Sequence, residues 1–313
     1  MIWDFDWREL PTEPFAFGLL ALLWGGSFVA IEAGVAEWPP LLFAAVRYDL
    51  AGALVLGFAA LRARRLRPRT RDDALAVTVV GVFVIFTHHA LLYVGQQTVP
   101  GAVAATVIAL SPAVTALLAP LLVGGERLRP VGYAGVAVGF LGVLAVTNPG
   151  AAGGVPTEGV ALVFGATLAF ALGSVLLRRV SPQLSLGALQ GWGMLLGAGL
   201  LHAGSVALGE PLVVAPSTTG LAALAFLVVG PGVVAFLLYF RLLGSVGATR
   251  TNLVGYLEPV AAAALAGLLF GYVPTAGAVV GFALVFAGFA LVKGDLLWPV
   301  VTSAVARFRA TIG

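Results

Sequence analysis

The sequence contains an internal repeat, and this repeat constrains the fold more than any local pattern does. Residues 99–146 hold two long apolar runs joined by a short turn, and residues 246–292 show the same arrangement. The matched positions, 146 or 147 residues apart, are Gly101 and Gly247, Pro112 and Pro259, Gly135 and Gly281, Phe140 and Phe286, and Gly142 and Gly288. A chain built from two copies of one unit is expected to fold as two similar halves.

The composition has too few charged residues to cover a water-facing surface. Only 10% of the 313 residues are charged and 60% are hydrophobic, whereas a soluble domain carries about 25% charged residues. The chain is therefore expected to lie in a lipid bilayer. It has no cysteine, which excludes disulfides and thiolate metal sites. The net charge is only +3 and the basic residues flank apolar runs, so no nucleic-acid partner is expected.

The apolar runs are long enough to predict membrane-spanning helices, each of which needs about 20 apolar residues. The ten predicted spans are 14–34, 41–61, 74–95, 101–122, 130–147, 158–177, 185–207, 218–240, 250–271 and 275–292. The sequence thus predicts an all-α polytopic membrane protein with ten transmembrane helices.

The basic residues predict which side each loop occupies, because cytoplasmic loops carry an excess of Lys and Arg. With the N-terminus in the cytoplasm, 16 of the 17 basic residues fall on cytoplasmic segments, and the predicted external loops hold none. The remaining one, Arg47, lies within a span. This distribution favours ten spans in the cell membrane with both termini cytoplasmic.

Each repeat unit contains five spans, and an odd number inverts the second copy relative to the first. We therefore expect a first five-helix repeat at 14–147 and a second, inverted one at 158–292. Residues 148–157 form the expected external linker, and residues 293–313 the expected cytoplasmic tail. Inverted repeats of this kind occur in secondary transporters.

Ionisable side chains within spans are costly in lipid and therefore mark candidate functional sites. Arg47 has two interpretations: it binds a substrate carboxylate or phosphate, or it pairs permanently with Glu32, Asp49 or Glu258. Glu258 is the foremost candidate for substrate binding and proton coupling, with a structural ion pair as its alternative. His88 is a second candidate for both roles, and a neutral, hydrogen-bonded histidine is its alternative.

Two prolines occupy equivalent positions in the repeats and predict helix kinks. Pro112 follows Ser111 in the fourth span, and Pro259 follows Glu258 in the ninth. Proline removes a backbone donor and frees a carbonyl about one turn earlier. Broken helices of this kind hold the substrate in inverted-repeat transporters, so Ser111 is also a candidate ligand.

Other polar and aromatic residues are candidates for lining a substrate cavity. The set is Trp24, Ser27, Tyr93, Gln190, Trp192, Asn252 and Tyr256. The alternative for each is that it binds one helix to another. Three Gly-x-x-x-Gly patterns are expected to serve helix packing, and they begin at Gly135, Gly193 and Gly277.

The sequence lacks the motifs of several enzyme classes. It has no Walker-type phosphate loop, no G-x-S-x-G, no H-E-x-x-H and no Cys/His metal cluster. No ATPase, cofactor or metal is therefore expected, and the chain is not expected to be an enzyme. The enzymatic alternative is an intramembrane site that uses His88 or His89.

These motifs together resemble the EamA-like transporters of the drug/metabolite transporter superfamily, over residues 15–292. The residues that carry the resemblance are Trp24-Gly25-Gly26-Ser27-Phe28, Arg47, Pro112, Gly124-Gly125-Glu126-Arg127-Leu128, Glu258-Pro259 and the two glycine-rich spans. One departure is Gly271-Tyr272, where the family often has Gly-Glu.

The resemblance implies ten helices in two inverted repeats and an alternating-access mechanism. It also implies an exporter of a small organic solute such as an amino acid, metabolite or drug, driven by a proton or substrate gradient. A passive facilitator on the same fold is the first alternative. The expected partners are the solute and the lipid bilayer, and the chain is expected to be a monomer or a homodimer.

Overall fold

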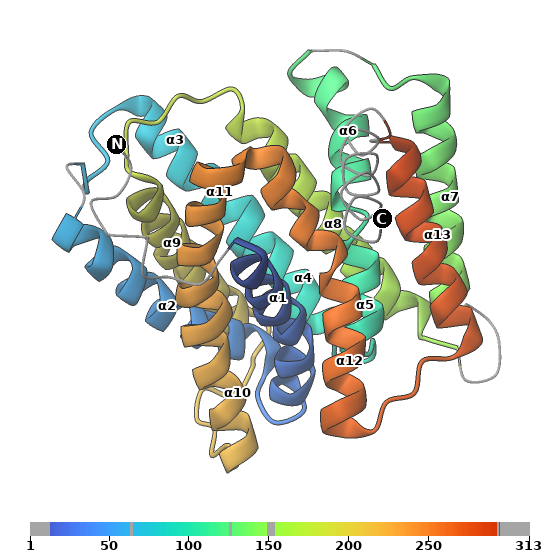
Figure 1. The fold of residues 1–313 in the computed structure, drawn as a ribbon. Helices are drawn as coiled ribbons and strands as arrows, with labels where there is room; N and C mark the ends of the chain where they lie inside the picture. Colours follow the sequence, from blue (N-terminus) through green and yellow to red (C-terminus); the bar gives the residue numbers. More distant parts are fainter. Residues whose placement is uncertain (1–12, 63–64, 125–126, 149–153, 293, 295–313) are drawn as a thin grey trace.

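The computed structural model describes residues 13–62, 65–124, 127–148, 154–292 and 294 (Figure 1), and all of its regular elements are helices. The helices of the first half are α1 (Glu13–Val35), α2 (Pro40–Arg62), α3 (Arg71–Val79), η2 (Val80–Thr87), α4 (His88–Gly95), α5 (Gly101–Ile108), α6 (Ser111–Leu122) and α7 (Pro130–Thr147). The helices of the second half are α8 (Thr157–Leu177), α9 (Leu186–Ala207), α10 (Thr218–Val229), η3 (Gly230–Val234), α11 (Ala235–Thr251), η4 (Asn252–Tyr256), α12 (Glu258–Phe270) and α13 (Ala276–Val292).

Helices occupy each of the ten predicted ranges. Seven helices or helix runs among the described residues are long and apolar enough to cross a membrane. The other three predicted spans correspond to α9, α12 and α13, of which the last two are apolar but shorter. The predicted tail at 293–313 lies outside the described residues except for Gly294.

Four of the predicted spans are interrupted. The third span contains the π-helix η2, and the eighth contains the π-helix η3 at nearly the equivalent place in the second repeat. The fourth divides into α5 and α6, and the ninth into η4 and α12. The eighth span also extends beyond its predicted end at residue 240, because helical backbone continues to Gly247, where φ is 81°. Glycine adopts this positive φ without a steric penalty, so the chain turns there.

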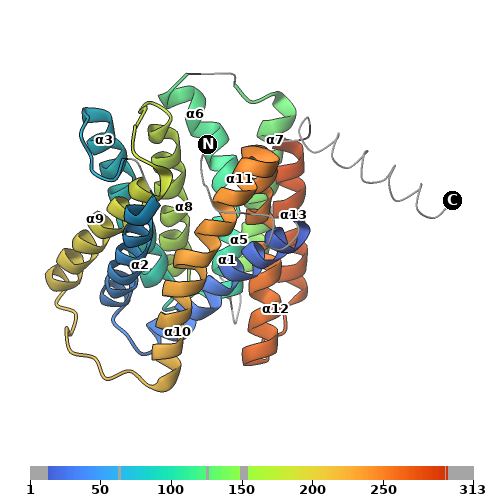
Figure 2. The same ribbon diagram turned by 60° about the vertical axis from the view of Figure 1, so that its left-hand side comes forward.

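Two pairs of long helices pack side by side. Figures 1 and 2 both show α7 beside α13 and α2 beside α9. A Cβ added at Gly135 would lie 2.5 Å from the Gly288 carbonyl oxygen, and one at Gly142 would lie 2.5 Å from that of Gly281. Only glycine permits such close backbone approach. The residue numbers run in opposite directions along this contact, so α7 and α13 are antiparallel.

The connections between helices gather at two ends of the molecule. We call one the Gly101 end, where the α1–α2, α4–α5, α9–α10 and α12–α13 connections lie, at the bottom of Figure 1. We call the other the Gly247 end, where the α2–α3, α6–α7 and α8–α9 connections lie and the chain turns at Gly247.

Carboxylates join the loops of the two halves at both ends. At the Gly247 end, Asp73 Oδ1 accepts hydrogen bonds from the backbone N–H groups of Gln183, at 2.7 Å, and Leu184, at 3.1 Å. At the Gly101 end, the Glu210 carboxylate accepts from the backbone N–H groups of Leu41 and Leu42, at 3.1 and 3.0 Å. These charge-assisted bonds hold the α2 and α9 regions together.

Candidate functional site

Arg47 is a buried cation whose partners are tyrosines. It lies on α2 with 5% of its surface exposed. Its Nη1 donates a hydrogen bond of 2.7 Å to the Tyr93 hydroxyl, and its guanidinium carbon lies 4.8 Å from the centre of the Tyr48 ring. Its Nε has no hydrogen-bond partner within the described part of the chain. The charge is therefore met by a hydroxyl dipole and a ring face rather than by an anion.

Two histidines extend this group of polar rings. The Tyr48 hydroxyl lies 2.5 Å from His89 Nε2. His89 Nδ1 lies 3.0 Å from the Ile85 carbonyl oxygen, and His88 Nδ1 lies 2.9 Å from the carbonyl oxygen of Ala166 on α8. Both histidines begin α4 directly after the π-helix η2, and π-helical turns often occur at functional sites.

These side chains form one continuous cluster between α2, α4 and α8. We call it the Arg47 cluster, and its members are Arg47, Tyr48, His88, His89 and Tyr93. The sequence pointed to Arg47, His88, His89 and Tyr93 as candidates, but it overlooked Tyr48 as a member. Tyr48 follows Arg47 in sequence, and a buried arginine next to an aromatic residue is the signal that was available.

Two of the acidic residues proposed as ion partners of Arg47, Glu32 and Asp49, have other partners. Glu32 Oε2 accepts a hydrogen bond of 2.7 Å from the backbone N–H of Gly101. Asp49 Oδ2 lies 2.6 Å from His202 Nε2, and both side chains are partly exposed. No ion pair joins Arg47 to Glu258 in the described part of the chain.

The chain leaves the α-helix just before each of the two repeat-equivalent prolines. α5 ends at Ile108 and α6 begins at Ser111, so that Pro112 is the second residue of α6. Ser111 is buried, and its hydroxyl donates a hydrogen bond of 2.6 Å to the Ile108 carbonyl oxygen. The first turn of a helix tolerates proline, because its N–H groups have no partner there.

The second break places Glu258 at the start of α12. Its carboxylate is half-buried, and no partner for it is found among the described residues. Its backbone carbonyl lies against α1, since a Cβ at Gly25 would be 2.6 Å from that oxygen. Pro259 follows as the second residue of α12 and is buried. Glu258 therefore lies beside α1, whereas the Arg47 side chain extends from α2 to Tyr93 on α4.

The aromatic candidates lie in three different places. The Trp24 ring packs on Tyr239 with ring centres 5.4 Å apart. Tyr256 stacks on Phe289 of α13 at 3.6 Å, and its buried hydroxyl has no partner within the described residues. Trp192 donates a hydrogen bond of 2.8 Å to the Leu66 carbonyl oxygen, in the α2–α3 connection.

Asn252 begins η4, and its side chain lies outside the described residues. Gly125 and Glu126, which precede α7 in the sequence, also lie outside the described residues. The candidates therefore separate into the Arg47 cluster, the neighbourhood of Glu258 beside α1, and single aromatic contacts elsewhere. The structure does not gather all of the candidates into one pocket among its described residues.

The described helices define a multi-pass membrane protein, with a buried polar cluster and two broken helices in its interior. The chain belongs to the EamA-like transporter family, whose sequence pattern matches residues 14–148 and again residues 157–294. The family resemblance expected from the sequence is thereby confirmed, and the family and the names of its relatives indicate a membrane transporter.

Relatives of known sequence agree with this assignment. The chain is 30% identical over 260 residues to the uncharacterized inner membrane transporter YedA of Escherichia coli strain K12, which covers 82% of this chain and 83% of that protein. It is also 26% identical over 285 residues to a Salmonella typhimurium strain LT2 protein named "Probable amino-acid metabolite efflux pump". That alignment covers 87% of this chain and 92% of the relative. A crystal structure with 23% identity superposes with a TM-score of 0.63 over 89% of this chain and 95% of that chain, which shows a shared fold.

Proposed function

We propose that the protein is a secondary transporter that exports a small organic solute, such as an amino acid or a metabolite, by alternating access. In this proposal ten helices cross the membrane as two inverted five-helix repeats. The substrate lies near the two helix breaks, and Arg47 and Glu258 are the principal polar groups. The protein acts as a monomer or a homodimer in the cell membrane.

The contact between α7 and α13 is the observation that carries the proposal. Gly135 and Gly142 of the first half are the repeat equivalents of Gly281 and Gly288. In the structure Gly135 meets Gly288, and Gly142 meets Gly281. Such a crossed contact, in which each residue meets the equivalent of the other, is expected of two units related by a two-fold axis. Because the helices are antiparallel, the two-fold axis that relates them is perpendicular to both. For helices that cross a membrane, such an axis lies in the membrane plane, and this supports inverted repeats.

The charge distribution supports an orientation for these repeats. Described arginines are concentrated in the connections of the Gly247 end, and the list is Arg65, Arg67, Arg69, Arg127, Arg129, Arg178 and Arg179. The described connections of the Gly101 end contain no Lys or Arg. By the positive-inside rule the Gly247 end faces the cytoplasm.

The Arg47 cluster supports a solute that carries an anionic group. A guanidinium with neutral partners and an unused Nε–H gains a charge-assisted hydrogen bond when a carboxylate arrives. The efflux-pump name of the Salmonella relative is consistent with an amino-acid metabolite as the solute.

The test is flux through purified protein in liposomes with an imposed pH gradient and a pH-sensitive dye inside. Amino acids, nucleosides, sugars and cationic drugs are added in turn. A compound that collapses the gradient only in vesicles containing the protein identifies a proton-coupled solute, and the expected responders carry a carboxylate. Vesicles without protein are the control.

Uptake of labelled solute separates the proposal from its alternative. Accumulation above the external concentration supports a coupled secondary transporter. Equilibration without accumulation, under every gradient applied, would show a passive facilitator instead.

A further inference from the structure

The two halves differ at one pair of repeat-equivalent glycines. Gly101 begins α5, and a Cβ there would lie 2.6 Å from the Phe28 carbonyl oxygen on α1. Gly247 lies 146 residues later at the equivalent turn, and a Cβ there would meet no atom of the described residues within 4 Å. α1 therefore closes onto the start of α5 at the Gly101 end. Within the described residues, the equivalent contact at the Gly247 end is open.

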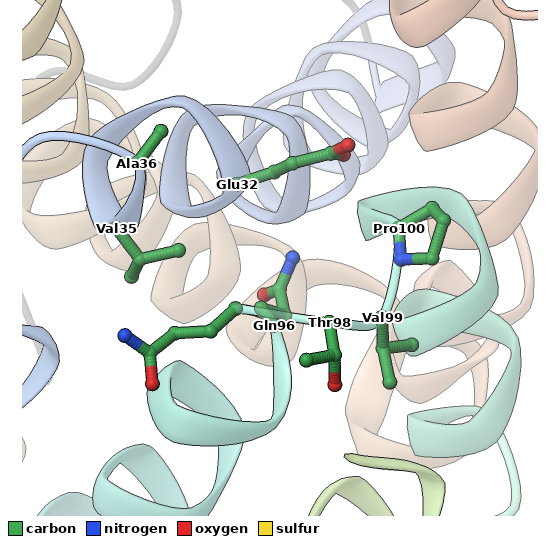
Figure 3. A pocket seen from close by; sticks show the side chains of 8 residues that line it. Glu32, Val35, Ala36, Gln96, Thr98, Val99 and Pro100 are labelled. Atoms are coloured by element: carbon green, nitrogen blue, oxygen red, sulfur yellow. The ribbon is translucent and has the colours of Figure 1, made fainter. Parts of the chain in front are cut away.

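Two hydrogen bonds hold the closed contact. Glu32 Oε2 accepts from the Gly101 N–H at 2.7 Å, and Gln96 Nε2 donates to the Phe28 carbonyl oxygen at 2.8 Å. Figure 3 shows the Glu32 side chain extending from α1 toward Pro100, on the wall of a cavity of ≈ 260 Å³. A carboxylate at the first residue of a helix is also favoured by the helix dipole.

The second half has none of these polar partners at the equivalent positions. At the same offset of 146 residues, Ser174 on α8 is equivalent to Phe28, so repeat symmetry pairs its backbone with Gly247. Arg178 stands where the first half has Glu32, and Leu242 stands where it has Gln96. An arginine cannot accept a hydrogen bond from a backbone N–H, and a positive charge near a helix N-terminus is unfavourable. Closure at the Gly247 end would therefore lack the bonds that hold the Gly101 end.

We propose that the contact of Phe28 and Glu32 with Gly101 is one gate of the transport cycle, and that the contact of Ser174 with Gly247 is the other. The inference rests on the proposed alternating access between inverted repeats. The two gates close in turn, and the structure has the first closed and the second open. The Glu32 and Gln96 bonds make this the resting state, because the second gate has no equivalent bonds.

The test uses single cysteines as reporters, since the chain has no cysteine of its own. Val99→Cys reports on the first gate, because Val99 lines the cavity beside Glu32 and is 1% exposed. Ser174→Cys reports on the second gate. Each purified reporter is reconstituted in vesicles of neutral lipid and treated with a membrane-impermeant maleimide from either side. In the otherwise unaltered chain, Ser174→Cys should react and Val99→Cys should be protected.

Three variants should reverse this pattern. Gly101→Ala places a methyl group against the Phe28 carbonyl, and Glu32→Ala removes the carboxylate acceptor. Arg178→Glu adds an acceptor for the Gly247 end without altering the first gate. Each should speed labelling of Val99→Cys and slow that of Ser174→Cys by about tenfold, because a hydrogen bond to a carboxylate shifts a two-state equilibrium by roughly that factor.

Two matched variants control for general loosening of the fold. Gly199→Ala adds a methyl group where no atom lies within 4 Å, and Arg179→Glu makes the same charge change one residue away from Arg178. Neither should alter the labelling of either reporter. Unchanged labelling in all three gate variants, or an equal change in the controls, would overturn the assignment of the gates.

The labelling requires no solute, so its failure is distinguishable from failure of the proposed function. Solute accumulation in vesicles with unresponsive reporters would reject these gates and leave a secondary transporter. Reciprocal labelling without accumulation of any solute against a gradient would support the gates and count against coupled transport.

Discussion

Arg47 illustrates at the scale of a single residue why burial of charge points to function. A guanidinium enclosed by protein is costly unless an anion or several acceptors compensate it. Its described contacts are the Tyr93 hydroxyl and the Tyr48 ring. In the proposed function, the solute supplies this anion.

Replacement of Arg47 tests this interpretation. Arg47→Lys keeps the positive charge but loses the planar fork that binds a carboxylate through two hydrogen bonds. We expect counterflow of a carboxylate-bearing solute to fall by roughly tenfold or more, since hydrogen bonds to charged groups contribute about 1.5–3 kcal/mol. Tyr93→Phe removes only the internal hydrogen bond and is the matched control. An equal loss in both variants would indicate that Arg47 has a structural role.

Glu258 is the residue on which proton coupling is expected to depend. Its carboxylate has no partner among the described residues, and it begins α12 at the helix break. Glu258→Gln keeps the shape and removes the titratable group, so transport should no longer respond to an imposed pH gradient. The measurement is solute uptake at several external pH values. Full pH-dependent uptake by the Gln variant would exclude Glu258 as the proton carrier.

At the scale of helices, small residues determine how closely α7 and α13 approach. Gly142→Ala would place a methyl group 2.5 Å from the Gly281 carbonyl oxygen and 2.7 Å from the Val285 nitrogen. Backbone atoms cannot move aside as a side chain does, so we expect a loss of about 1–3 kcal/mol in stability, the usual range for overpacking. Thermal unfolding in detergent measures this loss. Gly57→Ala, where no atom lies within 4 Å, should unfold at an unchanged or higher temperature.

The connection between α2 and α3 depends on Asp73 more than on its neighbour. Asp73 accepts hydrogen bonds from the backbone of Arg69, Thr70, Gln183 and Leu184, whereas among the described residues Asp72 accepts one, from Ser181. Asp73→Asn turns one acceptor oxygen into a donor that faces N–H groups. Its melting temperature in detergent should therefore fall further than that of Asp72→Asn. Equal melting temperatures would show that these bonds do not limit stability.

Sequence reasoning predicted the helices better than it predicted the contacts of the site. The ten apolar ranges appear as helices, since each was long and bounded by Gly, Pro or charged residues. The structure also contains a capping box formed by Thr70 and Asp73, which was not among the sequence predictions. The partners of Arg47 could not be predicted, because Tyr93 lies 46 residues away on another helix.

At the scale of the whole molecule, inverted repeats predict that equivalent loops face opposite sides of the membrane. Ala36 and Val213 lie at the Gly101 end, and Ser181 lies at the Gly247 end. In intact cells an impermeant maleimide should label Ala36→Cys and Val213→Cys, and should label Ser181→Cys only after the membrane is permeabilised. Labelling of Ser181→Cys in intact cells would contradict the inverted arrangement.

The amino-acid sequence was sufficient to predict the membrane environment, the helices and the two matching halves of this protein. It was sufficient because a bilayer requires long apolar helices and because the repeats match residue by residue. The pairing of polar groups became visible only in three dimensions: Arg47 with Tyr93, Asp49 with His202, and Glu32 with Gly101. Each pair joins different helices, and such contacts depend on the rotation and depth of both helices, which packing of the whole chain sets.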